Sequence, residues 1–292
     1  MGPCKSNEMT IVMNDYRLLD FGDGRKLECF GGVILDRPSP AAEGECRANA
    51  AKWREAHLQL DDATSKHWRF LKELPNPWTI NLGDVQMLLR PTPFGHIGVF
   101  PEQQINWEWF QSLTTAVGEV KRCLNLFAYT GASSLVLARA GWHVTHVDAS
   151  RPTILWGREN ATLSGLADAP IRWIQEDAKR FLQREVRRGN RYDLVLLDPP
   201  AYGHGPNGER WSIQEGMEDL LGSVFEVLVD RATGILWTGH SDADIVRPLV
   251  DQFKSVAQKV GLEPERLQRA SLNDATGRRL DFGYRVRWSP SG

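Results

Sequence analysis

The sequence has few cysteines and no pattern of metal ligands. Its 292 residues include only Cys4, Cys29, Cys46 and Cys123, and no two of them form a C-x-x-C pair. The seven histidines do not cluster with them at ligand spacing. These absences argue against a zinc or iron–sulfur site, so we predict no metal. Cys123 opens an apolar run, a position typical of a buried and inert thiol.

Long apolar runs and an excess of one charge are also lacking. No run of eighteen apolar residues is present, so no membrane-spanning helix is predicted. The first fifteen residues lack the basic-then-apolar order of a signal peptide, and we expect a cytoplasmic protein. The net charge of −2 is not the basic excess that nucleic-acid-binding proteins usually carry, although a local basic patch stays compatible with it.

The pattern of predicted secondary structure changes near residue 103. Residues 1–103 consist of strand-like segments and turns, including a hairpin predicted around the Asp23-Gly24 step. We also predict a helix over Ala48–Leu58, from its composition. From residue 104 to 292, short apolar strands alternate with helices, a pattern typical of a parallel sheet covered on both faces. The prediction is therefore an α/β protein, with a small β-rich N-terminal domain (1–103) and a catalytic domain (104–292).

The elements of the second region can be placed along the chain. A helix is predicted at about Trp107–Val117, before the first strand, and another from Ala132 to Gly141 after it. We expect strands at residues 123–127, 143–147, 171–175, 192–197, 234–238 and 284–288.

A glycine turn follows the first of these strands. The segment Leu124–Ser133 contains a buried strand, a turn at Gly131 and the start of a helix. Gly131 lets the backbone approach a ligand closely, and a helix N-terminus offers free N–H groups. The three-glycine fingerprint of dinucleotide-binding proteins is missing, which makes a dehydrogenase the least favoured interpretation.

Acidic residues follow the next two strands. Asp148 ends the second strand, where a carboxylate can accept hydrogen bonds from ribose hydroxyls. Asp177 follows the third strand, where a carboxylate can bind an adenine amino group. One such acid is more often a helix N-cap than a ligand contact. Two of them beside a glycine turn favour a nucleoside site.

The fourth strand is followed by Asp198-Pro199-Pro200-Ala201-Tyr202. Two prolines make this a rigid turn at the carboxyl edge of the sheet, where open α/β proteins bind ligands. A carboxylate and an aromatic ring on such a turn are suited to holding a planar acceptor. A purely structural loop is the alternative.

These motifs together resemble class I S-adenosylmethionine-dependent methyltransferases, which have a Rossmann-like sheet. The chain is most similar to bacterial large-subunit ribosomal RNA base methyltransferases and their uncharacterised relatives, which share an N-L-F-A-Y-T-G loop and a D-P-P-x-[FY] loop. The stretch Gly98–Trp107 resembles the element that precedes the first strand in that family. The resemblance covers about residues 90–240.

The resemblance implies S-adenosylmethionine as the cofactor and assigns residues to it. Asp148 would hold the ribose, Asp177 the adenine, and Asp198 would lie beside the methionine end. The implied cofactor-binding residues are Gln103, Asn106, Tyr129, Thr130, Gly131, Asp148, Ala149, Asp177, Ala178 and Asp198. The implied catalytic residues are Asp198, Pro199 and Tyr202, and we expect Tyr202 to stack on the acceptor.

The sequence also departs from that family. Its cytosine-C5 members use a cysteine nucleophile after the fifth strand, but residues 236–242 contain none, which disfavours covalent attack on a pyrimidine. Gln104 and Trp107 stand where the family has basic residues. His204 and His240 are candidates for a general base, or plain loop residues. The arginines at 180, 184, 187, 188 and 191 form a phosphate-binding face or a solvated helix face.

These observations favour a methyltransferase that acts on a nitrogen or oxygen of an RNA base or a similar planar acceptor. Its catalysis would depend mainly on proximity and orientation. An alternative is an enzyme of specialised metabolism that methylates a small molecule, or cyclises S-adenosylmethionine with release of methylthioadenosine. A non-catalytic nucleoside-binding module is a further alternative. The expected partners are S-adenosylmethionine and an acceptor that is either RNA or a small molecule.

Overall fold

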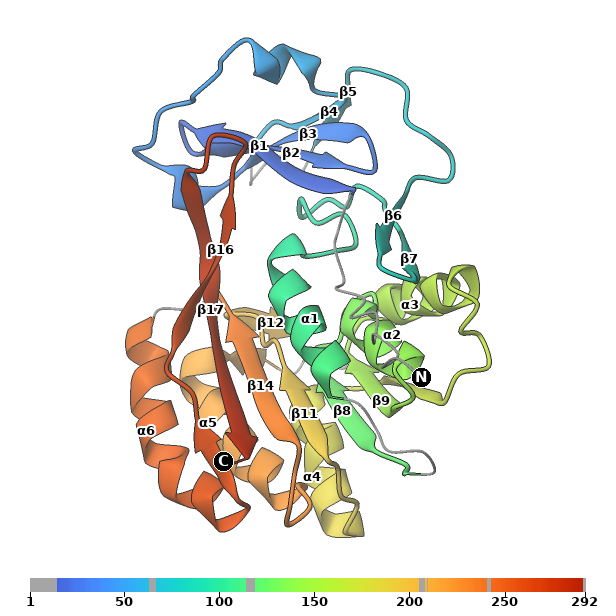
Figure 1. The fold of residues 1–292 in the computed structure, drawn as a ribbon, viewed down its shortest axis with the longest axis vertical. Coiled ribbons are helices and arrows are strands. Elements are labelled where there is room, and N and C mark those ends of the chain that lie inside the picture. Colours follow the sequence, from blue (N-terminus) through green and yellow to red (C-terminus); the bar gives the residue numbers. More distant parts are fainter. Residues whose placement is uncertain are drawn as a thin grey trace, which may run out of the picture.

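The protein consists of a large mixed sheet with helices on both faces and a smaller sheet beyond one of its edges (Figure 1). The computed structural model describes residues 15–290, except 63–66, 114–118, 205–207, 209, 241 and 242. In those residues, no helix has the length and apolarity needed to cross a membrane.

The large sheet has eight strands in the order β10-β9-β8-β11-β14-β17-β15, with β16 paired to β17. Its strands are β8 (Arg122–Leu126), β9 (His143–Asp148), β10 (Ile171–Gln175), β11 (Leu194–Leu197), β14 (Gly234–Gly239), β15 (Leu262–Pro264), β16 (Gln268–Asn273) and β17 (Arg279–Pro290). The first five strands of that order run parallel, and β17 is antiparallel to β14. Every residue of β11 and β14 is buried, as expected for strands covered on both faces.

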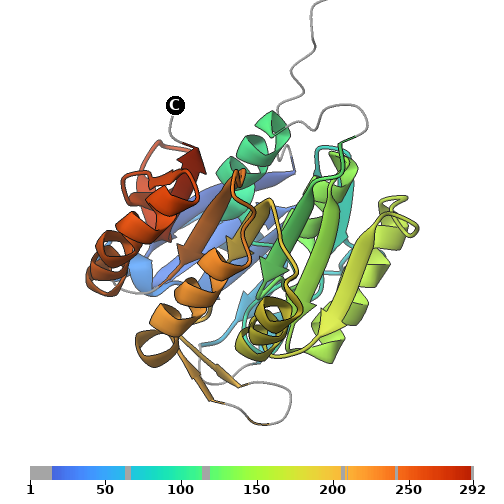
Figure 2. The same ribbon diagram turned by 90° about the horizontal axis from the view of Figure 1, so that it is seen from below.

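Helices cover both faces of this sheet (Figure 2). They are α1 (Gln104–Ser112), α2 (Ala132–Arg139), α3 (Arg151–Leu163), α4 (Ala178–Arg188), α5 (Ile213–Glu226) and α6 (Ala243–Lys259). Leu135 and Leu137 of α2 belong to one hydrophobic core, whereas Phe181 of α4 and Leu220 of α5 belong to the other. The predicted α/β sheet with helices on both faces is therefore confirmed.

The smaller sheet contains β1 (Tyr16–Gly22), β2 (Arg25–Phe30), β3 (Val33–Pro38), β4 (Leu58–Leu60) and β5 (Trp68–Phe70). The predicted hairpin is confirmed, because β1 and β2 pair antiparallel around Asp23 and Gly24. The predicted helix Ala48–Leu58 is wrong: only η2 (Lys52–Glu55) forms, and Leu58 begins β4. Asp20 accepts hydrogen bonds from the amides of Ala48 and Asn49, which holds this stretch in an irregular path.

Three shorter elements complete the approach to the sheet edge. They are η1 (Pro40–Ala42), the hairpin β6 (Thr79–Leu82) and β7 (Val85–Leu88), and η3 (Pro101–Gln103), which leads into α1. A further hairpin, β12 (Tyr202–His204) and β13 (Arg210–Ser212), follows β11.

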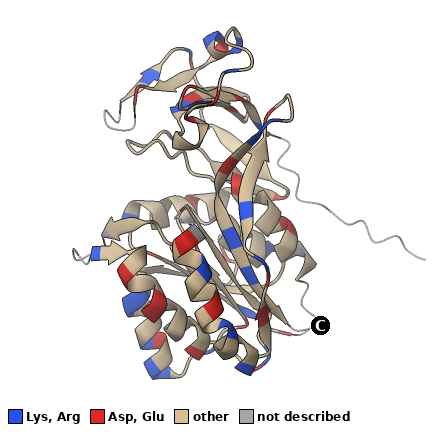
Figure 3. Ribbon diagram, turned by 90° about the vertical axis from the view of Figure 1, so that its left-hand side faces the viewer, with Lys and Arg blue, Asp and Glu red and all other residues tan. Residues whose placement is uncertain are grey.

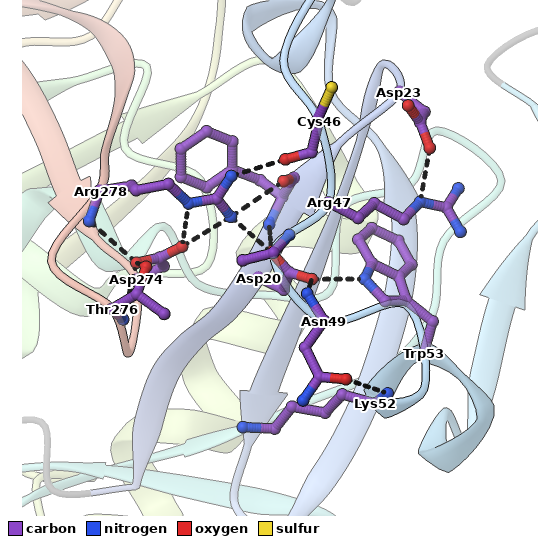
Figure 4. Close-up of polar contacts among 12 residues, drawn as sticks. Asp20, Asp23, Cys46, Arg47, Asn49, Lys52, Trp53, Asp274, Thr276 and Arg278 are labelled. Atoms are coloured by element: carbon purple, nitrogen blue, oxygen red, sulfur yellow. Dashed lines mark hydrogen bonds and ion pairs between the residues drawn. The ribbon is translucent and has the colours of Figure 1, made fainter.

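The β16–β17 hairpin joins the two sheets. Its tip carries Arg278, which forms ion pairs with Asp274 at the base of the tip and with Asp20 of β1 (Figure 4). Arg278 also donates from Nη1 to the carbonyl of Cys46 across 2.6 Å. Leu280 packs with Leu18 in a separate apolar cluster. The C-terminal strands thus hold the small sheet beside the carboxyl edge of the large one, and the domain division at residue 103 stays a prediction.

Candidate functional site

The loop after β8 has an unusual backbone. Phe127, Tyr129 and Gly131 have φ angles of 57°, 52° and 91°, in a region that bulky residues rarely occupy. Gly131 is the N-cap of α2, and a Cβ there would lie 3.4 Å from the ring of Trp173. The loop is fixed from outside, because Thr130 Oγ1 donates to the carbonyl of Gly98. It therefore presents helix N-terminal amides at the carboxyl edge of the sheet.

Two adjoining cavities lie at this edge, and we refer to them together as the cofactor cavity. They share Phe100, Phe127, Tyr129 and Asp198, and the larger has a volume of about 400 Å³. Of the residues predicted for cofactor binding, those that line one or both are Gln103, Tyr129, Thr130, Gly131, Asp148, Ala149, Asp177, Ala178 and Asp198. The elements that follow β8, β9, β10 and β11 thus converge on one space.

The Asp148 carboxylate is held in place at the end of β9. Oδ2 accepts from the amide of Tyr129 across 2.8 Å, and Oδ1 accepts from the amide of Ser150 and from Thr153 Oγ1, both across 2.9 Å. Burial raises the pKa of this carboxyl, and the three hydrogen bonds act in the opposite direction. The result is a fixed acceptor group in the wall of the cavity.

Asp177 is the N-cap of α4, which is the common role of an acidic residue between a strand and a helix. Its Oδ1 accepts from the amide of Arg180 across 2.9 Å. The residue lines the cavity as well. Its neighbour Glu176 also lines the cavity and forms an ion pair with Arg184 across 2.7 Å. We refer to the arginines at 180, 184, 187, 188 and 191 as the arginine stripe. One of them is therefore paired within its own part of the fold.

A chain of side chains fixes Asp198 at the end of β11. Gln103 donates from Nε2 to Asp198 Oδ2 across 3.2 Å and to Thr238 Oγ1 across 3.1 Å. Asn106 donates to Gln103 Oε1 across 2.7 Å, and Arg285 of β17 contacts Asn106 Oδ1 across 3.4 Å. Burial raises the pKa of Asp198, opposed by the charge of His240 and by the bonds from Thr238 and Gln103. Asn106 itself does not line the cavity, and its contact is with Gln103.

The structure places Tyr202 away from this space. Its side chain is 73% exposed, and it lines neither part of the cofactor cavity. Pro199 does line the cavity, and so does Trp211 of β13. Trp211 donates from Nε1 to the carbonyl of Pro200 across 2.7 Å, which ties the hairpin to the proline turn. Trp211 was missed in the sequence because it lies beyond the motif.

Comparison with known proteins decides the family. Residues 56–246, well over half of the chain, match the family described as S-adenosylmethionine-dependent methyltransferase. The chain belongs to this family. The solved S-adenosylmethionine-dependent methyltransferase from Agrobacterium tumefaciens is 36% identical, with a TM-score of 0.85 over 95% of this chain and 91% of that one. The predicted class I fold, enzyme class and S-adenosylmethionine cofactor are thereby confirmed.

The curated relatives align with part of this chain, and the chain aligns with a small part of each relative. The ribosomal RNA large subunit methyltransferase K/L of Shewanella frigidimarina is 34% identical over 110 residues, which is 37% of this chain and 15% of the relative. The protein of that name from Pseudomonas savastanoi pv. phaseolicola is 30% identical over 206 residues, which is 70% of this chain and 24% of the relative. The chain therefore spans a quarter or less of the length of these relatives.

A second cavity lies between the small sheet and the cofactor cavity of the methyltransferase. Its volume is about 690 Å³, and it shares His96, Phe100 and His240 with the larger part of the cofactor cavity. The charged residues in its wall are Lys26, Arg37, Glu102, Arg269 and Asp281. Nothing in the sequence indicated this cavity, because its wall combines residues of β2, β3, η1, β4, η3 and the β16–β17 hairpin with His240, which follows β14.

The described cysteines of the methyltransferase lie away from both spaces. Cys29 and Cys123 are buried and Cys46 is exposed, and none of these three lines either cavity, whereas Cys4 lies outside the described residues. Burial raises the pKa of the Cys123 thiol. Among the described residues, no three His, Cys, Asp or Glu side chains gather as metal ligands would. The side chain of His204 also lies outside the described residues.

Proposed function

We propose that this methyltransferase transfers a methyl group from S-adenosylmethionine to a nitrogen or oxygen atom of an RNA base. The observation that carries the proposal is the shared wall of the two cavities, formed by His96, Phe100 and His240. A planar ring in the second cavity would approach the cofactor beside Asp198. The second cavity, at about 690 Å³, has room for a group of base size.

The residues present fit the cofactor. We propose that Asp148 holds the ribose hydroxyls, because its carboxylate is fixed in the cavity wall by three donors. Asp177 and Ala178 would lie beside the adenine, and the loop at Thr130 and Gly131 beside the methionine part. Asp198 would lie near the sulfonium group, whose positive charge favours a neighbouring carboxylate.

The cofactor supplies an activated methyl group, so the chain has to orient the acceptor and exclude water. The Asp198 carboxylate is held by Gln103, and the two prolines that follow keep the turn rigid. In this position Asp198 can accept a hydrogen bond from the acceptor and align its lone pair. Residues of the small sheet and of the β16–β17 hairpin line the second cavity.

The choice of RNA is supported by the names of the curated relatives, which are ribosomal RNA methyltransferases. The charge distribution favours the alternative, a small planar molecule. The net charge is −2, and Figure 3 shows both signs of charge mixed on the side that faces the viewer. Arg184 and Arg188 of the arginine stripe are paired with Glu176 and Glu185. An RNA acceptor would therefore need contacts beyond a broad basic face.

Incubation with methyl-labelled S-adenosylmethionine tests this proposal. Unmodified ribosomal RNA and a small-metabolite extract are supplied separately, and the products are identified by mass spectrometry. We expect label in a base of the RNA. We expect none with Asp198→Ala, and its melting temperature is measured to show that this variant is folded. Label only in the metabolite pool would overturn the RNA assignment. Release of methylthioadenosine without transfer would indicate cyclisation of the cofactor.

A further inference from the structure

His240 lies where an acceptor and the cofactor would meet. It directly follows β14 and lines both the cofactor cavity and the second cavity. Its side chain is 59% exposed, so it is open to the cavity space, and Nε2 lies 3.7 Å from Oε1 of Glu102. We propose that His240, positioned by Glu102, accepts the proton that the acceptor atom loses during methyl transfer. This inference rests on the proposed function.

Glu102 is a buried carboxylate that lacks a close neutralising partner. Its side chain is 7% exposed, and the ion pair found for it among the described residues is the 3.7 Å contact with His240. Burial raises the pKa of Glu102, as does the neighbouring charge of Asp198, whereas Lys26 and His240 lower it. A buried carboxylate is costly unless a positive group lies beside it. A protonated His240 would supply that charge.

A second carboxylate also acts on the imidazole. The charge of His240 lowers the pKa of Asp198, and electrostatic coupling of this kind is reciprocal. Asp198 directly follows β11, and Glu102 belongs to η3. Two carboxylates from different elements are thus placed to interact with a charge on His240.

The cations near this group are largely committed elsewhere. Lys26 of β2 lies 3.3 Å from Glu28, and Arg37 of β3 forms an ion pair with the same carboxylate. Arg37 also donates from Nη1 to the carbonyl of Gly95 across 2.7 Å. His96 shares both cavity walls with His240, and Arg269 and Asp281 of the β16–β17 hairpin line the second cavity as well. Among the described residues, His240 is the basic group found within ion-pair distance of Glu102.

The proposed step balances in atoms and charge. The lone pair of the acceptor nitrogen or oxygen forms a bond to the methyl carbon. The bond between sulfur and that carbon breaks, and its electron pair stays on sulfur as S-adenosylhomocysteine forms. The acceptor then carries one proton too many, and this proton passes to the imidazole of His240. One positive charge has moved from the sulfonium to the imidazolium, between two carboxylates that stabilise it.

Nε2 is the ring nitrogen on the side of Glu102, 3.7 Å from Oε1, so the proposal assigns the acceptor's proton to Nδ1. Glu102 is therefore a positioning residue, and His240 is the residue that meets the acceptor.

The test compares His240→Ala, Glu102→Gln and a matched control, His143→Ala. His143 is exposed and begins β9, at the amino edge of the same sheet. Transfer of labelled methyl groups is measured into ribosomal RNA and into the metabolite extract, and binding of S-adenosylhomocysteine is measured by calorimetry. We expect His240→Ala to lose about a hundredfold or more in turnover, the usual contribution of a positioned acid–base group. Its affinity for S-adenosylhomocysteine, and both properties of His143→Ala, should match the wild type.

Rescue by added imidazole distinguishes a proton-accepting role of His240 from a structural one, because imidazole cannot repair a structural defect. Because the side chain of His240 is open to the cavity, imidazole from solution should restore part of the turnover of His240→Ala, and more so as the pH rises through the pKa of imidazole. Glu102→Gln should retain activity but shift the acidic limb of its pH profile to lower pH, because the protonated imidazole loses the neighbouring carboxylate charge. Full turnover in His240→Ala, or a loss that imidazole never restores, would overturn the inference alone. Absence of transfer by the wild type to either pool would overturn the proposed function, and this inference with it.

Discussion

Gln103 donates a hydrogen bond from its side-chain amide to the carboxylate of Asp198, across 3.2 Å and 95 residues of sequence. The amide is itself held by Asn106, through a bond of 2.7 Å to Gln103 Oε1. The other groups that lower the pKa of Asp198 are His240 and Thr238. The segment before the large sheet therefore controls a carboxylate at the centre of the site.

We expect Gln103→Ala to weaken methyl transfer. The substitution removes a donor to a buried carboxylate, which costs about 1.5–3 kcal/mol, or roughly ten- to a hundredfold in rate if the bond persists in the transition state. Gln104→Ala is the matched control, because Gln104 donates to Glu108 across 3.0 Å instead. Turnover with labelled cofactor checks this. Equal rates for the two variants would mean that Gln103 has no role in the reaction.

Trp211 and Tyr202 should respond differently to the same kind of change. Trp211→Phe removes the donor to the Pro200 carbonyl and should weaken binding of S-adenosylhomocysteine by about 1 kcal/mol, roughly fivefold. Tyr202→Phe keeps the ring and should alter neither affinity nor turnover appreciably. Calorimetry and rate measurements on both variants decide. A large loss of turnover confined to Tyr202→Phe would show that its hydroxyl takes part.

The pH dependence of stability should report His146. This side chain is fully buried, contacts Ser134 Oγ across 2.9 Å, and burial lowers its pKa to about 3. The unfolded chain binds the proton at its usual pKa, near 6.5, so stability is complete above that pH and falls as the pH drops toward 3. At pH 5 the loss from this group is about 2 kcal/mol. Urea unfolding of His146→Gln should show a correspondingly shallower decline between pH 7 and 5, and parallel curves would refute the assignment.

The contact between the two sheets should matter for stability. Asp20 is 1% exposed and pairs with Arg278. Burial opposes ionisation of Asp20, but hydrogen bonds from Trp53 and three backbone amides outweigh it and lower its pKa. Asp20→Ala should cost about 3 kcal/mol, as expected for one partner removed from a buried pair. Asp23 forms an ion pair with Arg47, and its side chain is 61% exposed. Asp23→Ala should therefore cost under about 1 kcal/mol when both variants are unfolded in urea.

The large sheet could be predicted from the sequence because its strands are short apolar runs between helices. The strand predicted at residues 171–175 agrees with β10, and the one at 192–197 begins two residues before β11. The helix predicted at Ala48–Leu58 fails because composition alone does not reveal that Asp20 binds the backbone there. Local propensity was overridden by a contact from another element.

The site was predictable where motif and strand end coincide, as at Asp148 and Asp198. Residues that reach the site from elsewhere carry no local signal. Arg285 is 179 residues from Asn106, which it contacts, and Glu102 acquires its importance from a histidine in another element. Tyr202 follows the prolines in sequence, but the β12–β13 hairpin places Trp211 in the cavity wall instead.

Binding of S-adenosylhomocysteine to the wild type and to Asp148→Ala tests the central claim about this site most directly. Calorimetry should give one molecule per chain for the wild type. For Asp148→Ala the loss should be about 1.5–3 kcal/mol, the scale of hydrogen bonds to a charged group. Asp168→Ala, an exposed position after α3, should bind as the wild type does, and all three proteins should show cooperative unfolding. Unchanged affinity in a folded Asp148→Ala protein would contradict the account.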